Sequence, residues 1–392
     1  MTAARPTPDV AVIGGGIVGA ATAAFLAADG AAVTLWERTE IAAAASGRNS
    51  GVVQHPFDPV LVELYRQTLA LYRVLASTAA SAAPFDFAAE PAGLMLVGGG
   101  EDGAAAAADL ARAWAAAYPD ARPELVAGAA LRSLEPGLAD DVTACRLAIG
   151  YPVAPASATR AFAALAAARG ATVVTGRTVR PEIRDGVAIG VAVDGEVRPA
   201  DTVVVAAGPW APDLLRGAFD VPIVPVWGVV AGIDLPDPPR HVLEEIEIDI
   251  EPADAGEPAD GDGEAAGGGE GDGAFGFSLV TAGRASALGS TFLADEPDPA
   301  AVVDRLRDRG ARYVPALAIA PLTGVRACAR PVSVDRRPIV GRVPGVDGAF
   351  ICAGHGPWGI STGPATARMV ADLVLGRPAG IPMGLDPARF GR

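Results

Sequence analysis

Three glycines at a fixed spacing near the start of the chain form a pattern that binds phosphate groups. Gly14, Gly16 and Gly19 follow a short β-branched run at residues 9–13 and lead into a run of small residues at 20–28. In a G-x-G-x-x-G loop, the first glycine allows a tight turn, the second lets the backbone approach a pyrophosphate, and the third lets the helix pack against the strand. The free N–H groups and the positive dipole end of the helix attract the phosphates.

An acidic residue completes this pattern. Residues 32–36 form a second apolar run, and Glu37 follows at its tip, where a carboxylate can accept hydrogen bonds from an adenosine ribose. The order strand, glycine loop, helix, strand and acid therefore predicts a dinucleotide site. The structural alternative is a glycine-rich turn in an alanine-rich protein.

The last quarter of the chain repeats the arrangement of strand, glycine loop and helix. An apolar run at 349–353 leads to Gly354-His355-Gly356-Pro357-Trp358-Gly359, and a helix is expected at 360–375, before Gly376 and Pro378. The N-terminus of this helix is a second seat for a polar or anionic group.

The net charge and the composition of the chain exclude some classes of partner. The chain has 392 residues and a net charge of −15, which argues against nucleic acid and anionic membrane surfaces as partners. An anionic substrate needs only a local basic pocket. All 31 basic residues are arginine, so no lysine can act as a Schiff base, a general base or an oxygen-activating cation.

The cysteines indicate the compartment. Cys145, Cys328 and Cys352 are widely spaced and odd in number, which gives no disulfide framework and favours a reduced, cytoplasmic location. The apolar stretch at 10–28 is too short, and too often interrupted by glycine, to span a membrane.

Periodicity indicates a mixture of helices and strands. Helices are expected at 60–75, 101–118, 129–134, 155–169 and 300–313, and strands at 93–97, 177–183, 187–193, 201–207, 223–233 and 242–250. A tract at 251–274, rich in Gly, Asp and Glu, lacks apolar residues and is interpreted as a flexible insertion. Asp260, Asp262 and Glu264 do not complete a calcium loop, and no metal site is expected.

Four stretches together resemble one family. They are VIGGGIVGAATAAFLA, ASGRNSG, VVVAAGPWA, and RPVSVDRRPIVG followed by AGHGPWGIST. The chain resembles, over nearly its whole length, the FAD-dependent D-amino-acid oxidase, glycine oxidase and sarcosine oxidase family. The resemblance implies an α/β (α+β) fold with a Rossmann-like FAD-binding domain interleaved with a substrate domain on a mostly antiparallel sheet. The FAD-binding domain is expected at 1–58, 145–216 and 320–392, and the substrate domain at 59–144 and 217–319.

The resemblance also assigns cofactor residues. It places the pyrophosphate at the first glycine loop, the ribose at Glu37, the adenine near Val179 and the pyrimidine end of the flavin at the second glycine loop. The full set of expected FAD-binding residues is Gly14, Gly16, Ile17, Val18, Gly19, Glu37, Arg38, Ser46, Gly47, Arg48, Asn49, Ser50, Gly51, Val179, Ala206, Ala207, Gly208, Trp210, Gly354, His355, Gly356, Gly359, Ile360 and Ser361.

The substrate implied by the family is an amine that carries a carboxylate. Arg330, five residues before Asp335, matches the family's carboxylate-binding arginine, and Arg326 is a second candidate. An arginine suits this task because its planar fork binds both carboxylate oxygens. His55 and His355 fall in flavin-side segments and are further catalytic candidates, although a packing role is equally expected for each.

Two departures from the family limit the prediction. Sarcosine-type oxidases use lysines near the flavin and this chain has none, so a dehydrogenase is slightly favoured over an oxidase, and the acceptor is oxygen or another electron acceptor. Cys328 has the spacing of a cysteine that binds flavin covalently, but Ala329, Arg330 and Pro331 resemble the non-covalent branch.

The alternative functions are a 2-hydroxy acid dehydrogenase and a flavoprotein subunit of an electron-transferring complex. The sequence leaves open the substrate side chain and the oligomeric state.

Overall fold

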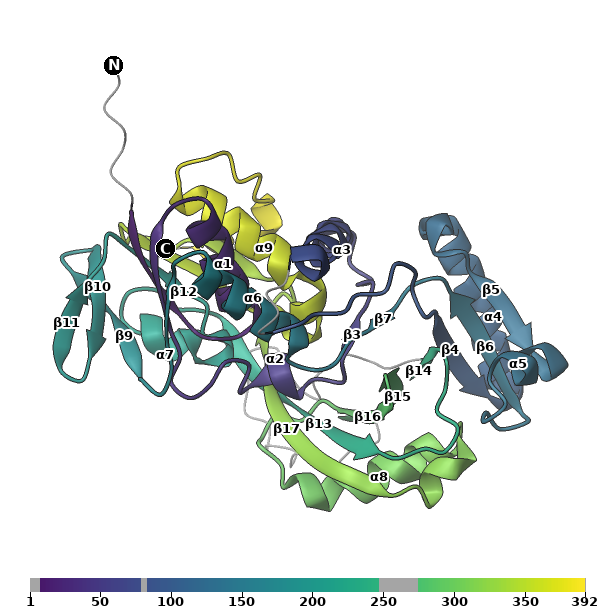
Figure 1. Cartoon of the computed structure of the whole chain (residues 1–392). Helices are drawn as coiled ribbons and strands as arrows, with labels where there is room; N and C mark the ends of the chain where they lie inside the picture. The colour runs from purple at the N-terminus through teal and green to yellow at the C-terminus, as the bar shows by residue number, and fades with distance from the viewer. Residues whose placement is uncertain (1–7, 79–82, 247–273, 392) are drawn as a thin grey trace, which may run out of the picture.

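Two large sheets organise the computed structural model, which describes residues 8–78, 83–246 and 274–391 of the chain (Figure 1). The first sheet has six strands in the order β18-β19-β12-β1-β2-β8, and all neighbours are parallel except β18 and β19. Its strands are β1 (Asp9–Ile13), β2 (Ala32–Trp36), β8 (Thr172–Val174), β12 (Thr202–Val205), β18 (Ile339–Arg342) and β19 (Ala349–Ala353).

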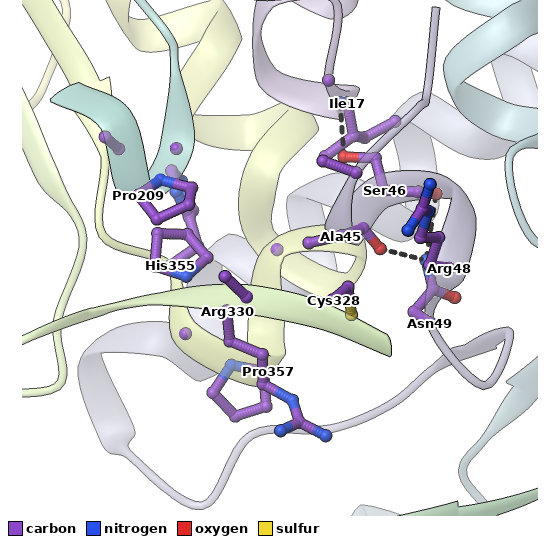
Figure 2. Close-up of a pocket in the computed structure, with 18 of the residues that line it drawn as sticks. Ile17, Ala45, Ser46, Arg48, Asn49, Pro209, Cys328, Arg330, His355 and Pro357 are labelled. Atoms are coloured by element: carbon purple, nitrogen blue, oxygen red, sulfur yellow. Dashed lines mark hydrogen bonds between the residues drawn. The ribbon is translucent and has the colours of Figure 1, made fainter. Parts of the chain in front are cut away.

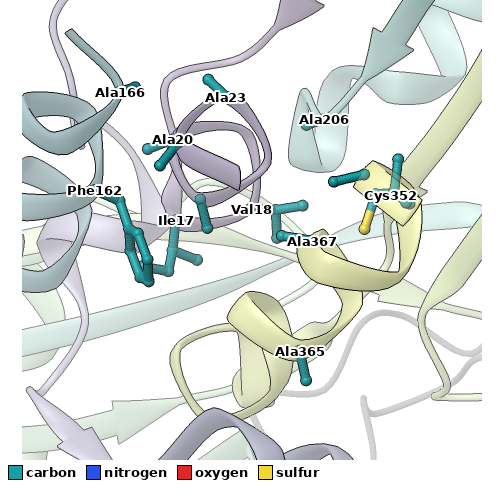
Figure 3. Packing of buried hydrophobic residues seen from close by; sticks show 14 of the residues in the cluster. Ile17, Val18, Ala20, Ala23, Phe162, Ala166, Ala206, Cys352, Ala365 and Ala367 are labelled. Carbon is teal, nitrogen blue, oxygen red and sulfur yellow. The ribbon is translucent and has the colours of Figure 1, made fainter. Parts of the chain in front are cut away.

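Helices, most of them rich in small residues, cover one face of this sheet. They are α1 (Ile17–Ala28), α3 (Pro59–Thr78), α6 (Ser157–Ala168) and α9 (Gly359–Val374). Ala20 and Ala23 of α1 have no exposed surface, and they lie beside α6 and α9 in the core (Figure 3). Alanine side chains let the helix axes approach closely, which holds the N-terminus of α1 at the end of β1.

The other face of the six-stranded sheet packs against β9 (Val179–Arg184), β10 (Val187–Val193) and α7 (Ala211–Leu215). β9 and β10 form an antiparallel sheet with β11 (Glu196–Pro199), as the alternating pattern at 177–193 predicted.

The second sheet has eight strands in the order β17-β13-β16-β15-β14-β4-β6-β5. Its strands are β4 (Leu94–Gly99), β5 (Glu124–Ala127), β6 (Val142–Leu147), β13 (Ile223–Ile233), β14 (Val242–Glu245), β15 (Phe275–Ala282), β16 (Ala285–Thr291) and β17 (Leu322–Ser333). All neighbours are antiparallel except β4 and β14.

This second sheet is covered differently on its two faces. On one face, α8 (Pro299–Ala311) and α5 (Gly128–Leu134) bury an apolar core against it. On the other, α4 (Gly100–Ala117) covers only the end formed by β4 and β6, where Trp114 packs on Leu96 and Leu147. The rest of that face is turned toward the six-stranded sheet.

Short elements connect the two sheets. They include α2 (Ala45–Arg48) and the two-stranded sheet of β3 (Val52–Val53) and β7 (Tyr151–Pro152). Among the described residues, no helix has the length and apolar character needed to cross a membrane.

The mixed parallel and antiparallel fold is confirmed, but two of the expected domain boundaries do not coincide with the division between the two large sheets. The division at 144/145 falls inside β6, and β17 belongs to the eight-stranded sheet although 320–392 was assigned to the FAD-binding domain. Apolar alternation identifies a strand without its partners, which explains both differences. The division into domains stays a prediction, and residues 247–273, with most of the expected insertion at 251–274, lie outside the described residues.

Candidate active site

The first glycine loop has the close contacts that its motif predicts. Gly14 has φ of +114°, and a Cβ there would collide with the carbonyl oxygen of Ala206. A Cβ on Gly19 would collide with the carbonyl oxygen of Gly14. At Gly16, by contrast, the only atom that a Cβ would meet within 4 Å is Oγ of Ser46, at 3.1 Å. Gly16 lines the cavity at the start of α1, where the absence of a Cβ leaves its backbone accessible to a pyrophosphate.

Glu37 supports this loop from the tip of β2. Its Oε2 accepts a hydrogen bond from the Gly15 N–H at 2.7 Å, and its Oε1 accepts one from the Thr39 N–H at 2.9 Å. The side chain also lines the cavity, so its predicted contact with a ribose remains compatible with this position. Arg38 stacks on the Trp210 ring at 3.7 Å, and both residues line the same end of the cavity.

The loop after α2 is held by side-chain hydrogen bonds to its own backbone. The Asn49 amide donates to the carbonyl oxygens of Ala45 and Ser46 at 3.0 Å, and its Oδ1 accepts from the Gly51 N–H at 2.8 Å (Figure 2). The hydroxyl of Ser46 accepts from the Ile17 N–H at 2.9 Å, which joins this loop to α1.

Arg326 supports the same loop instead of facing the cavity. Its guanidinium donates to the carbonyl oxygens of Arg48 at 3.1 Å and Asn49 at 2.9 Å. It is not among the residues that line the cavity, which corrects its assignment as a second substrate-binding arginine. The sequence spacing could not separate the two arginines, because alternate residues of one strand share a face.

A cavity of 1270 Å³ joins these loops to the eight-stranded sheet. It runs from the first glycine loop, past Arg38 and Val179, to the second glycine loop and the uncovered face of the sheet. Of the expected cofactor residues, those that line it are Gly14, Gly16, Ile17, Val18, Glu37, Arg38, Ser46, Arg48, Asn49, Ser50, Val179, Ala206, Ala207, Gly208, Trp210, His355, Gly356, Gly359, Ile360 and Ser361. Gly19, Gly47, Gly51 and Gly354 lie behind the lining, where they serve the turns.

Arg330 lies at the sheet end of this cavity, close to His355 and Pro357 (Figure 2). Its Nη1 donates to the Thr291 carbonyl oxygen at 2.7 Å, and its Nη2 donates to Oγ of Ser290. The guanidinium lies across Gly228, where any side chain would collide with it. Burial lowers the pKa of Arg330, and among the described residues no carboxylate pairs with it. A partly buried cation without a carboxylate partner favours an anionic ligand.

His355 lines the cavity as a neutral side chain. Its Nε2 lies 2.8 Å from Oγ1 of Thr366, and burial lowers its pKa to about 3. The second glycine loop therefore presents an uncharged imidazole.

His55 lies outside the cavity lining, which corrects the expectation that it overhangs the site. Its ring is surrounded by Tyr65, Trp114 and Tyr118, with centroid distances of 5.3, 5.2 and 4.8 Å. Both ring nitrogens are buried without a hydrogen-bond partner, and burial lowers the pKa of His55. Side chains alternate along this extended segment, so Gln54 faces the cavity in its place.

Cys328 lines the cavity between the two arginines of its strand. Burial raises the pKa of its thiol, against the opposing charges of Arg330, Arg326 and Arg48. A raised pKa reduces the thiolate that covalent attachment needs.

Several residues at the sheet end were missed by the sequence analysis. Trp227, Glu244, Ser278, Ser290 and Phe292 come from strands that are distant in sequence. Adjacent acids at 244 and 245 within an expected strand were the available signal, because one of the two must face away from the core.

The fold and the nucleotide loops define a flavoenzyme. The chain matches the family of FAD-dependent oxidoreductases over residues 9–373, and it belongs to that family. It is therefore an FAD-dependent oxidoreductase, and the Gly16 backbone, which lines the cavity without a Cβ, fits the pyrophosphate of that cofactor.

Particular relatives narrow the comparison. The chain is 29% identical over 378 residues to a glycine oxidase from Geobacillus kaustophilus, which covers 93% of this chain and 92% of the relative. The crystal structure of a glycine oxidase from that organism superposes with a TM-score of 0.80 at 24% sequence identity. The match covers 98% of this chain and 99% of the chain in that crystal structure. A glycine oxidase from Pseudomonas aeruginosa is 30% identical over 217 residues. This match covers 54% of this chain and 51% of the relative's length. An iminodiacetate oxidase from Chelativorans sp. has a TM-score of 0.79 at 25% identity, covering 96% of this chain and 98% of its own.

Proposed function

We propose that this enzyme oxidises the C–N bond of an amine that carries a carboxylate: glycine, a D-amino acid or an N-alkyl amino acid. The observation that carries the proposal is Arg330, a partly buried guanidinium at the sheet end of the cofactor cavity that has no carboxylate partner among the described residues. Relatives named as glycine oxidase and iminodiacetate oxidase act on substrates of this kind, which supports the proposal.

The task of the protein is to hold the substrate in one orientation. Ser290 and Thr291 accept two of the Arg330 N–H groups and so fix the plane of its guanidinium. Its remaining donors are then available to a substrate carboxylate. Binding the carboxylate directs the adjacent C–H toward the cofactor, which reduces the entropy that the reaction must lose. FAD supplies the hydride acceptor at N5, and the imine product hydrolyses.

An amine is favoured over a 2-hydroxy acid by the state of the histidines. Oxidising an alcohol requires a base for the hydroxyl proton, whereas a neutral amine needs none. His355 has a pKa of about 3 and is bonded to Thr366, and His55 is enclosed by aromatic rings outside the cavity. Neither histidine is placed to act as that base.

We further propose that FAD is bound non-covalently and that a dehydrogenase is favoured over an oxidase. The raised pKa of Cys328 supports the first point, and the absence of lysine from the sequence supports the second. Operation as one subunit of an electron-transferring complex remains the alternative.

The test is a steady-state comparison of glycine, sarcosine, D-alanine, proline and 2-hydroxyglutarate with an artificial dye as acceptor. We expect turnover with at least one of the amines and none with the hydroxy acid. Turnover of 2-hydroxyglutarate alone would refute the proposal.

A further inference from the structure

The uncovered face of the eight-stranded sheet carries an acid as well as Arg330. Glu244 and Glu245 are neighbours on β14, and their side chains point to opposite faces. Glu245 forms an ion pair with Arg309 of α8 at 2.7 Å and accepts a hydrogen bond from Tyr313 at 2.8 Å. Glu244 therefore points away from α8, and it lines the cavity together with Ser278 of the adjacent strand.

Glu244 has a hydrogen-bond partner but no cationic partner in the part of the chain that the structure describes. Gln54 donates one hydrogen bond to its Oε2 at 2.7 Å, and the nearby cavity lining includes Leu96 of the paired strand β4. Among the described residues, no arginine or histidine forms an ion pair with Glu244. Burial raises its pKa to about 7, although the hydrogen bond from Gln54 acts in the opposite direction.

Gln54 links this acid to the flavin-side loop. Its backbone N–H donates to Oγ of Ser361 at 2.9 Å, at the start of α9, while its side chain holds the Glu244 carboxylate. The acid is thus held in place on the cavity side and is positioned relative to the second glycine loop.

The strand order places Glu244 two strands away from the strand that Arg330 contacts. Arg330 bonds Ser290 of β16, and β15 alone separates β16 from β14. Two strand spacings correspond to about 10 Å. The carboxylate and amine of a simple α-amino acid are attached to the same carbon, so these two groups are too close together to span that separation.

We propose that Glu244 is a specificity-determining residue that binds a cationic group at the far end of the substrate. The preferred substrates are then amino acids with a second ammonium or guanidinium group several carbons from the carboxylate held by Arg330. This inference rests on the proposed function, because it requires a carboxylate at Arg330.

The test compares two ligands of the oxidised holoenzyme that differ only at the far end. Hexanoate ends in a methyl group, and 5-aminopentanoate ends in an ammonium group at the same position. Their binding constants are measured from the change in flavin absorbance at about pH 8.5, where a carboxyl group of pKa about 7 is ionised and the ammonium remains charged. The proteins compared are the parent, Glu244→Gln, Glu244→Leu and, as a control, Glu101→Gln, which removes an exposed acid of α4.

We expect 5-aminopentanoate to bind the parent and Glu101→Gln about tenfold or more tightly than hexanoate, as a charge-assisted contact provides. The preference disappears in Glu244→Gln and Glu244→Leu, while hexanoate affinity stays the same or improves. Equal binding of both ligands to the parent, or a preference that survives in both Glu244 variants, overturns the inference and leaves the proposed function intact. If neither ligand binds the FAD-loaded parent, the carboxylate site itself is wrong and both proposals fail.

Discussion

Replacing Arg330 by alanine tests the carboxylate site directly. In the structure, the guanidinium has hydrogen bonds to Thr291 and Ser290 and lies over the Phe292 ring at 4.7 Å, but it has no acidic partner among the described residues. The substitution therefore removes a cation that is available to a ligand and leaves every cofactor loop in place.

The expected magnitude follows from this environment. A charge-assisted hydrogen bond contributes about 1.5–3 kcal/mol, which corresponds to roughly a tenfold to 150-fold loss of affinity for a carboxylate ligand. Arg330→Lys should recover only part of that loss, because an ammonium cannot reproduce the planar fork between Ser290 and Thr291.

Arg326→Ala provides a matched control on the same strand. Arg326 donates to the backbone of Arg48 and Asn49, so its loss should loosen the loop after α2 and lower FAD retention. Its effect on carboxylate affinity per FAD-loaded site should be small. Arg326→Ala should therefore lower FAD content with little change in carboxylate affinity, whereas Arg330→Ala should lower carboxylate affinity with little change in FAD content.

The assay measures FAD content and then the hexanoate binding constant, from flavin absorbance, in all three variants. The reasoning is refuted if Arg330→Ala binds hexanoate as tightly as the parent. It is also refuted if Arg326→Ala loses the affinity while retaining FAD, since the carboxylate would then bind at Arg326, further along the same face of the strand.

Three further predictions concern the cofactor and the buried histidine. Gly16→Val should abolish FAD retention, because the side chain would crowd Ser46 and enter the cavity that Gly16 lines; a folded variant with normal flavin absorbance would contradict this. Dye-linked turnover should exceed oxygen consumption, since the sequence has no lysine to promote reaction with oxygen, and air reoxidation as fast as turnover in stopped-flow would disprove it. Burial lowers the pKa of His355 to about 3, so below pH 6.5 the unfolded chain binds a proton that the folded protein does not, and stability falls as the pH decreases. Urea unfolding at pH 7.5 and pH 5 should show a loss that is about 2 kcal/mol larger in the parent than in His355→Gln, and equal losses would contradict the assignment.

The sequence predicted the nucleotide end of the molecule in detail. Gly14, Gly16, Gly19 and Glu37 lie within one continuous strand–loop–helix–strand unit, so their spacing in the chain largely determines their arrangement in space. The close contacts at Gly14 and Gly19 agree with the roles that the motif assigns.

The substrate end could not be predicted in the same way. Arg330, Ser290, Ser278 and Glu244 come from four strands, and only the order of strands in the sheet brings them to one face. That order depends on pairing between segments far apart in the chain, which local periodicity does not encode. His55 is a second example, within one segment. Neighbouring side chains of an extended segment point in opposite directions, so Gln54 lines the cavity and His55 does not.

Glu244 and Glu245 point to opposite faces of the sheet, so the residues that stabilise the fold differ from those that line the cavity. The face of the sheet that packs against α8 holds the Arg309–Glu245–Tyr313 network and the apolar core, and substitutions there change folding stability. The opposite face lines the cavity, and its polar residues Glu244, Ser278 and Ser290 are not part of that core. Under the proposed function, substitutions at positions 54, 244, 278 and 290 should therefore change which amino acid is accepted and leave the core under α8 in place.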